Sequence, residues 1–257
     1  MKPKKSLGQN WLNDKDSLDY IIGLALCSSK DFVLEIGPGQ GALTRQLVKR
    51  VGQVLAVELD SSLITSLRKI NASNLQVVQG DFLQFRLEDL PRFYKVVANV
   101  PYYITSKIIK KLLTTSNKPA RIVLLLQKEV AERLAAGPGD YSILGISAQF
   151  YAVIELGRVI TAENFEPRPK VDSRVVIMTP HNKYQDVDDK LFFRVVKAGF
   201  SARRKKLRSS LAGGLNLTKT KTDELLNKAK IDPNLRSQDL AIDDWLKIAS
   251  MLAQIKN

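Results

Sequence analysis

A glycine-rich turn, Gly37-Pro38-Gly39-Gln40-Gly41, constrains the fold of this chain more than any other sequence feature. The mostly apolar residues 31–36 before it are typical of a buried parallel strand, and apolar residues resume after it at helical spacing, at Ala42, Leu43, Leu47 and Val48. Glycines at such a strand-to-helix turn allow a close approach to a ligand, while the helix offers free amide hydrogens to an anion. The turn therefore predicts a ligand site, and a tight turn that binds nothing is the alternative.

The spacing of the glycines narrows the choice of ligand. The third glycine follows the second by two residues, whereas the dinucleotide-binding fingerprint usually places it three residues away. With Glu35 two residues ahead of the first glycine, the segment resembles motif I of the Rossmann-like S-adenosylmethionine methyltransferases. That resemblance implies S-adenosylmethionine as the cofactor, with Gly37 and Gly39 among the residues that bind it.

The net charge of the 257-residue chain limits its partners. Lys and Arg number 40 against 26 Asp and Glu, which gives +14 and favours a polyanion, either nucleic acid or an anionic membrane surface. No apolar run is long enough to span a membrane, and no apolar core typical of a signal peptide follows the N-terminal lysines. We therefore expect a cytoplasmic protein that does not enter the membrane.

The chain contains one cysteine, Cys27, and one histidine. A lone cysteine cannot form an intrachain disulfide and fits a reducing compartment, and a zinc cluster would lack ligands, so we expect no metal. Because Cys27 lies in an apolar helical stretch, we interpret it as a small core residue rather than a nucleophile.

Strand and helix patterns alternate after the glycine turn. Apolar runs of strand length occur at residues 53–57, 75–78, 94–98 and 122–126, with helical patterns between them. Such βα repeats imply a parallel sheet covered by helices, which residues 152–156 and 175–178 should close as antiparallel strands. We therefore predict an α/β fold: a Rossmann-like methyltransferase domain over residues 1–181, with a mostly parallel sheet and an antiparallel last strand.

Both ends of the chain depart from this pattern. Trp11 and Leu12 are poor residues for a free tail, so residues 1–13 are expected to form a strap that folds back onto the domain. The next helix should have an apolar face from Leu18 to Leu26. Beyond Pro180 only helical patterns occur, which predicts a small all-helical domain over residues 182–257, with helices at 191–200, 202–211, 223–229 and 239–252.

Polar residues stand where the predicted strands end: Glu35, Glu58, Asp81 and Asn99. Ligands of open α/β sheets bind at the carboxyl ends of the strands, so these residues should converge on one crevice. Glu58, about twenty residues beyond the turn, is suited to the ribose hydroxyls of the cofactor, and Asp81 to its adenine amino group. Three acids near one pocket fit a cationic ligand without phosphate better than a dinucleotide. Each acid alone could instead be a helix cap or a turn residue.

The segment Asn99-Val100-Pro101-Tyr102 indicates the reaction. It resembles motif IV of methyltransferases that act on exocyclic amines, whose lone pair is delocalised into the ring. The Asn99 side-chain oxygen and the Pro101 carbonyl can each accept one amine hydrogen and so localise the lone pair, and Tyr102 can stack on the base. Positioning and electrostatics then make a strong general base unnecessary. A polar turn between strand and helix is the structural alternative.

A proline-stiffened loop, residues 165–173, is the third candidate piece. Phe165 could cover the other face of a flipped base, while Arg168 and Lys170 could contact phosphates. A rigid hairpin connection is an equally good interpretation of this loop by itself.

Six segments together resemble the ribosomal RNA adenine dimethyltransferase family, in order along nearly the whole chain: residues 5–12, 37–41, 99–102, 127–134, 165–173 and 200–208. The resemblance is closest to the bacterial kasugamycin-sensitivity branch, which dimethylates two adjacent adenosines near the 3′ end of small-subunit rRNA. It implies that Asn10 and Leu12 close over the cofactor and that Gly37, Glu58, Asp81 and Asn99 contact it. Trp11 departs from the usual Phe, and the loop at 137–142 looks shorter than usual.

Basic residues outside the pocket are predicted to bind RNA. Residues 203–208 include five cations in six positions, and with the net charge of +14 phosphate binding is favoured over a merely solvated face. The predicted RNA-binding residues are Lys4, Lys5, Arg168, Lys170, Arg203, Arg204, Lys205, Lys206 and Arg208. We expect a monomer whose partner is rRNA within the small ribosomal subunit or its precursor.

Three other functions are open on the sequence. A large-subunit rRNA adenine methyltransferase of the macrolide-resistance branch would share these motifs, although Asp172-Ser173 and residues 200–208 argue modestly against it. A non-catalytic RNA-binding assembly factor on the same fold would not need an intact cofactor pocket. A nicotinamide oxidoreductase is disfavoured by the glycine spacing.

Overall fold

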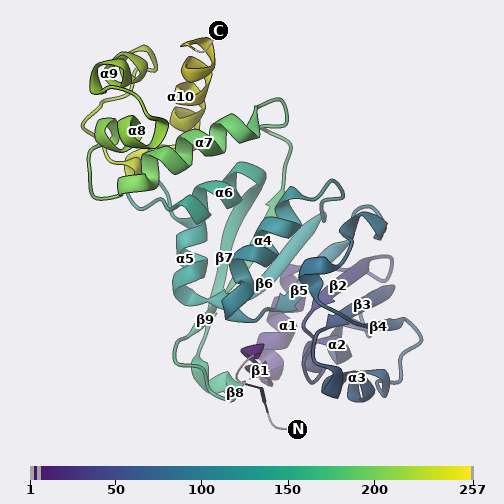
Figure 1. The fold of residues 1–257 in the computed structure, drawn as a ribbon. Helices are drawn as coiled ribbons and strands as arrows, with labels where there is room; N and C mark the ends of the chain where they lie inside the picture. The colour runs from purple at the N-terminus through teal and green to yellow at the C-terminus, as the bar shows by residue number, and fades with distance from the viewer. Residues whose placement is uncertain (1–2, 5–6, 256–257) are drawn as a thin grey trace. The chain divides into compact units, whose positions relative to one another are not determined.

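A seven-stranded sheet forms the centre of the first of two units in the computed structural model, which describes residues 3–4 and 7–255 (Figure 1). The strands follow the spatial order β4-β3-β2-β5-β6-β9-β7. Neighbours from β4 to β6 pair in parallel, whereas β9 pairs antiparallel with both β6 and β7, as predicted. The strands are β2 (Phe32–Ile36), β3 (Gln53–Glu58), β4 (Leu75–Gln79), β5 (Lys95–Asn99), β6 (Arg121–Gln127), β7 (Ala152–Ile160) and β9 (Ser173–Pro180).

Helices cover both faces of this sheet (Figure 1). On one face, α1 (Lys15–Leu24) and α2 (Ala42–Leu47) share an apolar core with strand residues such as Val33 and Val97. On the other face, α4 (Thr105–Thr114) buries Ile108 and Leu112. Asp60 caps α3 (Ser61–Arg68), because its side chain accepts from Ser62 N at 3.0 Å. The remaining short elements are η2 (Phe82–Gln84), η3 (Leu87–Asp89), η4 (Tyr102–Ile104), α5 (Lys128–Ala135) and η5 (Ala162–Asn164).

The N-terminal strap is tied to the first unit by a two-stranded sheet. β1 (Trp11–Leu12) pairs antiparallel with β8 (Phe165–Glu166). Trp11 is 8% exposed and Leu12 is 3% exposed, so this pairing removes two large apolar side chains from water. The expectation that this segment folds back onto the domain is confirmed for the part of it that the structure describes.

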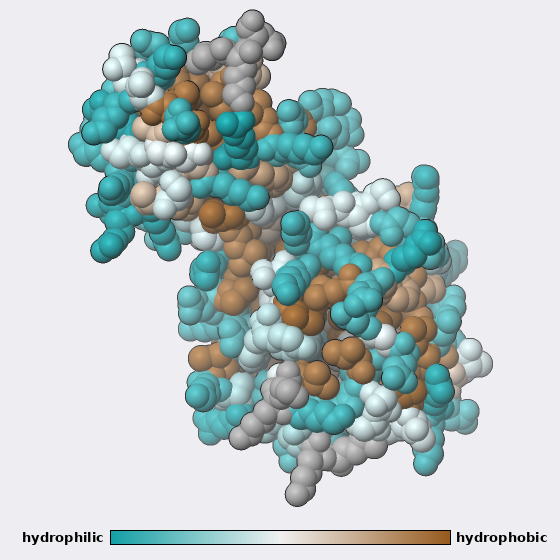
Figure 2. All heavy atoms as spheres, viewed as in Figure 1, coloured by the Kyte–Doolittle hydropathy of each residue, from teal (hydrophilic) through white to brown (hydrophobic). Residues whose placement is uncertain are grey.

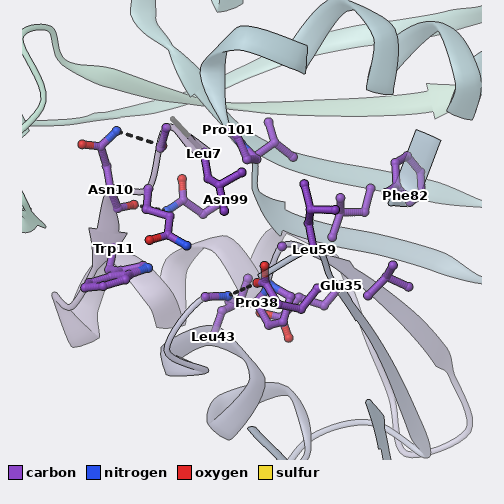
Figure 3. A pocket seen from close by; sticks show the side chains of 18 of the residues that line it. Leu7, Asn10, Trp11, Glu35, Pro38, Leu43, Leu59, Phe82, Asn99 and Pro101 are labelled. Atoms are coloured by element: carbon purple, nitrogen blue, oxygen red, sulfur yellow. Dashed lines mark hydrogen bonds between the residues drawn. The ribbon is translucent and has the colours of Figure 1, made fainter. Parts of the chain in front are cut away.

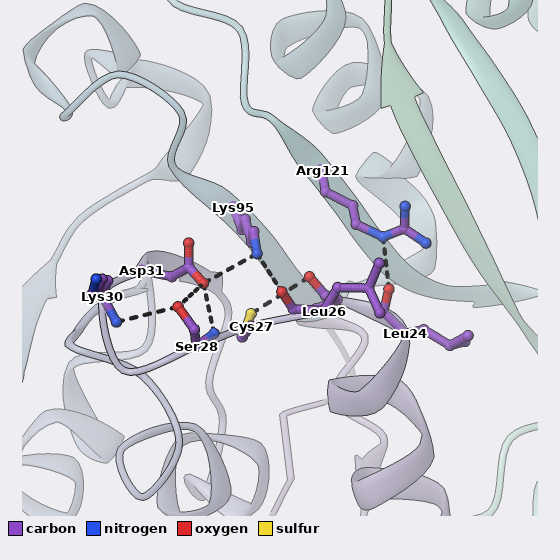
Figure 4. Close-up of polar contacts among 9 residues, drawn as sticks. Leu24, Leu26, Cys27, Ser28, Lys30, Asp31, Lys95 and Arg121 are labelled. Carbon is purple, nitrogen blue, oxygen red and sulfur yellow. Dashed lines mark hydrogen bonds and ion pairs between the residues drawn. The ribbon is translucent and has the colours of Figure 1, made fainter.

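The end of α1 lies at the edge of the sheet where β5 and β6 begin (Figure 4). Arg121 Nε donates to the carbonyl oxygen of Leu24, the last residue of α1, at 2.7 Å, and Lys95 Nζ donates to that of Leu26, two residues beyond the helix. The predicted apolar face ends early, because Leu26 has a φ of +49° and is 67% exposed. Burial raises the pKa of the Cys27 thiol and disfavours a nucleophilic thiolate.

The second unit is helical and comprises residues 133–151 together with those from 182 onward. Its core surrounds Trp245 and Phe192, and the ring of Phe150 stacks on Phe192 with centroids 4.4 Å apart. The predicted boundary at residue 181 therefore leaves out 133–151, whose apolar side chains pack among the C-terminal helices. The helices are α6 (Ile143–Tyr151), α7 (Asp189–Gly199), α8 (Leu207–Leu215), α9 (Lys219–Lys228) and α10 (Ile242–Ile255), with the short helices η6 (Phe200–Ala202) and η7 (Ser237–Asp239).

The basic run lies in a turn rather than in the predicted helix at residues 202–211. α8 begins only at Leu207, because the four consecutive cations at 203–206 offer no apolar side chain to a core. Figure 2 shows hydrophilic residues over much of the surface of each unit on the face in view. Within the described ranges, no helix combines the length and the apolar character that crossing a bilayer requires.

Candidate active site

A pocket in the first unit opens at the carboxyl ends of β2, β3, β4 and β5 (Figure 3). The strap contributes a further wall, and Leu43, Leu59 and Phe82 supply apolar surface that the sequence analysis did not single out. The pocket brings together nine predicted residues: Asn10, Leu12, Gly37, Gly39, Glu58, Asp81, Asn99, Pro101 and Tyr102.

The glycine turn is fastened to the end of β3. Gly39 has a φ of +59°, and its N–H donates to Glu58 Oε2 at 2.9 Å. The other oxygen of Glu58 accepts the Asp60 N–H at 2.8 Å. Burial raises the pKa of Glu58, although both amide hydrogen bonds oppose the rise. Because a carboxylate oxygen can accept two hydrogen bonds, Glu58 keeps the capacity to accept from ribose hydroxyls.

Asp60 holds the strap over the pocket. It is 3% exposed and accepts hydrogen bonds from Lys4 Nζ at 2.7 Å and from Gln9 Nε2 at 2.9 Å. Burial opposes its ionisation, but the donors outweigh burial and hold the pKa of Asp60 well below its ordinary range. Lys4, predicted to contact RNA, is therefore an ion-pair partner within the protein. Lys5 lies outside the described residues.

The side chain of Asn99 is oriented by the strap. Its Nδ2 donates to the backbone oxygen of Asn10 at 2.9 Å, and a carbonyl can only accept, so the Asn99 nitrogen must face the strap (Figure 3). No described residue donates to Asn99 Oδ1, which is left free at the pocket. The Pro101 carbonyl accepts from Ile104 N and Thr105 Oγ1, both at 3.3 Å. Such long bonds are weak, so this oxygen can also accept from a substrate.

Tyr102 is held by the end of the proline-stiffened loop. Its hydroxyl lies 2.7 Å from Oγ of Ser173, a fully buried residue at the start of β9. Burial raises the pKa of Tyr102, so the phenol stays neutral. No local sequence pattern points to Ser173 as a site residue, because it lies 71 positions from its partner.

Phe165 does not line the pocket as predicted. It is 5% exposed and packs beside Leu12 in the core beneath α1, because the β1–β8 pairing turns its ring inward. Arg168 and Lys170 are exposed and line a shallow groove beside α5. The ion pair of Arg168 with Glu163, 3.3 Å long and open to solvent, leaves Arg168 able to exchange partners.

Asp81 both caps a short helix and lines the pocket. Its Oδ1 accepts from Leu83 N at 2.8 Å and so caps η2, as a turn acid would, yet the residue also lines the pocket. Among the residues that the structure describes, no three His, Cys, Asp or Glu side chains come together as metal ligands.

The basic turn in the second unit exposes Arg203, Arg204 and Lys205 to solvent. Lys206 is exposed too, but its Nζ donates to Asn234 Oδ1 at 2.8 Å. Arg208 differs from these four, because its guanidinium forms a partly buried ion pair with Asp223. That pair ties α8 to α9, so Arg208 has a packing role where an RNA contact was predicted.

Glu35 is the acid whose environment fits a cationic ligand best. It lines the pocket, is 1% exposed, and its Oε2 has no hydrogen-bond partner in the described part of the chain. Burial raises the pKa of Glu35 to about 8, and the nearby Glu58 carboxylate adds to the rise. A nearby cation favours the ionised form of a buried carboxyl, so Glu35 at the pocket wall can give up its proton when it faces the positive charge of S-adenosylmethionine.

We predict that Glu35→Gln changes how stability depends on pH. The folded wild type keeps the Glu35 proton up to about pH 8, whereas an unfolded chain releases it near the ordinary pKa of 4.5. The free energy of unfolding should therefore fall as the pH rises between these values, by on the order of a few kcal/mol, and level off above them. Glutamine cannot titrate, so the variant should lack this component. Denaturant unfolding of both proteins from pH 5 to pH 8 measures the difference, and parallel profiles would contradict the assignment.

The family model for ribosomal RNA adenine dimethylase matches residues 1–254. This chain belongs to that family. It is 40% identical over 257 residues to ribosomal RNA small subunit methyltransferase A of Dehalococcoides mccartyi, covering 96% of this chain and 88% of the relative. A protein of the same name from Nostoc sp. is 40% identical over 269 residues, which cover 98% of each chain.

Solved structures agree with this family assignment. A dimethyladenosine transferase from Plasmodium falciparum superposes with a TM-score of 0.80 at 28% identity, covering 92% of this chain and 95% of that one. The 23S rRNA methyltransferase ErmE gives a TM-score of 0.76 at 25% identity, covering 95% of this chain and 100% of that one. The predicted methyltransferase fold, the adenine-methylating activity and S-adenosylmethionine as methyl donor are confirmed by the family.

Proposed function

We propose that this protein dimethylates the exocyclic amines of two adjacent adenosines near the 3′ end of 16S rRNA during ribosome biogenesis. The observation that carries this choice of substrate is the 40% identity, over nearly the full length, to relatives named small subunit methyltransferases. The pocket supports the chemistry, because Asn99, with its free amide oxygen, and Pro101, with a weakly bonded carbonyl oxygen, both line it at the end of β5.

In this proposal the cofactor lies along the ends of β2, β3 and β4. Glu58 accepts from its ribose hydroxyls, Asp81 accepts from its adenine amine, and Glu35 faces its positive charge. Gly37 and Gly39 let the backbone approach it, while Asn10 and Leu12 close the strap over it. When bound, S-adenosylmethionine supplies the electrophilic methyl group.

The residues at the end of β5 then act on the target amine, whose conjugated lone pair makes it a poor nucleophile. Asn99 Oδ1 and the Pro101 oxygen each accept one amine hydrogen, which reduces conjugation with the ring and localises the lone pair on the nitrogen. Tyr102, held by Ser173, presents its ring to the base. Phe165 supports the strap through Leu12 in this scheme. After the first transfer the methylated nitrogen releases one proton to water, which leaves one amine hydrogen that either oxygen can accept during the second transfer.

The set of RNA-binding residues that we propose is smaller than the sequence suggested. In the second unit it comprises the exposed turn of Arg203, Arg204, Lys205 and Lys206. In the first unit it comprises Arg168 and Lys170 beside α5. Exposed cations without a buried partner can bind phosphates and release counterions. We propose that the protein acts in the cytoplasm as a monomer and without a metal ion. The single cysteine supports the reducing compartment.

Methylation of large-subunit rRNA is the second candidate, and the similarity to ErmE favours it. Labelled S-adenosylmethionine should be incubated with undermethylated small subunits and, separately, with naked large-subunit rRNA. We expect two methyl groups on each of two adenosines near the 3′ end of the small-subunit RNA, and none on the other substrate. Transfer to the large-subunit RNA alone would support the second candidate. RNA binding without transfer to either substrate would indicate a non-catalytic assembly factor.

A further inference from the structure

An exposed row of side chains runs from the mouth of the pocket along α4. Lys107, Lys110 and Thr114 are exposed, and their spacing of three and four residues puts them on one side of α4, while the exposed Tyr103 lies in η4 just before this helix. Between them, Ile108, Ile109, Leu112 and Leu113 are buried against the sheet. We call these four exposed residues the α4 row. Because η4 leads directly into α4, the row begins at the catalytic segment and leads away from it.

The two lysines of the α4 row have no acidic partner among the described residues. α4 itself contains no acidic residue, although exposed helices commonly pair a lysine with an acid one turn away. The adjacent Lys111 is turned aside, since its Nζ donates to Leu83 O at 2.8 Å and lies 5.7 Å from the centre of the Phe82 ring. Lys107 and Lys110 therefore present two uncompensated charges on the row.

Tyr103 is the exposed aromatic residue among those that line the pocket. It is 56% exposed, and its hydroxyl has no hydrogen-bond partner among the described residues. A Cβ on Gly8 would lie only 3.2 Å from Cδ1 of Tyr103, so one edge of the ring rests on the strap. A large ring that rests on the strap along one edge and is otherwise open to solvent offers a stacking surface for a base.

We propose that the α4 row binds the single-stranded RNA next to the target adenosine. The ring of Tyr103 stacks on the neighbouring base, and Lys107 and Lys110 bind the phosphates that follow. This inference rests on the proposed function, because a substrate with two adjacent adenosines must keep one at the mouth while the other is in the pocket. The α4 row then keeps the RNA strand bound while the second adenosine replaces the first in the pocket.

The test compares Lys107→Ala/Lys110→Ala with Lys49→Ala/Lys69→Ala, a control that removes the same charge from exposed positions after α2 and α3. RNA affinity should be measured against salt concentration, and methyl transfer should be measured on undermethylated small subunits. For the α4 variant we expect the slope of log K against log salt to fall by about 1.4, because a single strand loses roughly 0.7 per phosphate contact. Its KM for RNA should rise while kcat at saturating RNA and the affinity for S-adenosylmethionine stay unchanged.

Tyr103→Ala should reduce kcat/KM for RNA by between about fivefold and hundredfold, and Tyr103→Phe should keep wild-type values, because stacking needs the ring and not the hydroxyl. A salt slope for the α4 double variant equal to that of the control, or full activity in Tyr103→Ala, would overturn the inference. A wrong proposed function would give a different result, because the wild type itself would then not methylate the small-subunit RNA.

Discussion

Asn99→Ala is expected to reduce kcat for methyl transfer by on the order of a hundredfold to a thousandfold, the usual cost of removing one preorganised polar group that acts on the reacting atoms. The variant loses the oxygen that we propose accepts an amine hydrogen, so the lone pair should stay delocalised into the ring. RNA affinity should fall much less than kcat, because phosphate contacts dominate it and the uncharged Asn99 at the end of β5 makes none. Single-turnover transfer at saturating RNA and cofactor separates this chemical effect from binding.

Two further variants, one at Asn99 and one control elsewhere, make this test more specific. Asn99→Asp keeps an oxygen for the amine but turns a second one toward the Asn10 carbonyl, where the wild type donates at 2.9 Å. We expect its loss of kcat to be smaller than that of alanine and accompanied by a loosened strap. Asn71→Ala removes the same side chain from an exposed position outside the pocket and should leave kcat at the wild-type value. Wild-type kcat in Asn99→Ala would remove Asn99 from the mechanism.

The convergence of the pocket residues could be predicted from the sequence because parallel strands end at the same edge of a sheet. Glu58, Asp81 and Asn99 each follow a recognisable apolar run, so their meeting required only the strand assignment. Contacts between segments far apart in the sequence cannot be predicted from the strand assignment. Nothing local about Asp60 predicts that it binds Lys4, 56 positions away, and such contacts decide how the strap is held.

The structure differs from three of the expectations. Phe165 looked like a stacking residue because it is aromatic and beside prolines, but pairing with the strap places it in the core. The predicted helix at residues 202–211 included the four cations at 203–206, yet a helix needs an apolar side to pack, and α8 begins only at Leu207. The boundary at residue 181 left out α6 because the apolar side chains of Ile146 and Phe150 do not reveal which core they join.

Gly39→Ala is expected to weaken cofactor binding by at least about tenfold and to lower the free energy of unfolding by roughly 1–3 kcal/mol. A left-handed φ of +59° costs a residue with a Cβ about 1–2 kcal/mol. The new Cβ would also lie 2.8 Å from Cδ1 of Trp11, closer than real contacts allow, so the strap must shift. Because Gly39 N also donates to Glu58, a shift of the turn disturbs the proposed ribose acceptor as well. Calorimetry with S-adenosylmethionine and denaturant unfolding measure the two effects.

A second substitution separates the two causes of the defect, the contact with Trp11 and the left-handed backbone. Trp11→Phe in the Gly39→Ala background shortens the ring that the new Cβ meets, so it should recover part of the lost stability, while the cost of the left-handed backbone stays. Gly23→Ala is the matched control, because no atom lies within 4 Å of its added Cβ and its place in α1 favours alanine by roughly 0.5–1 kcal/mol. Equal stability of Gly39→Ala and wild type would mean that the turn tolerates a side chain, and that its glycine serves neither the close approach of the strap nor the contact with Glu58.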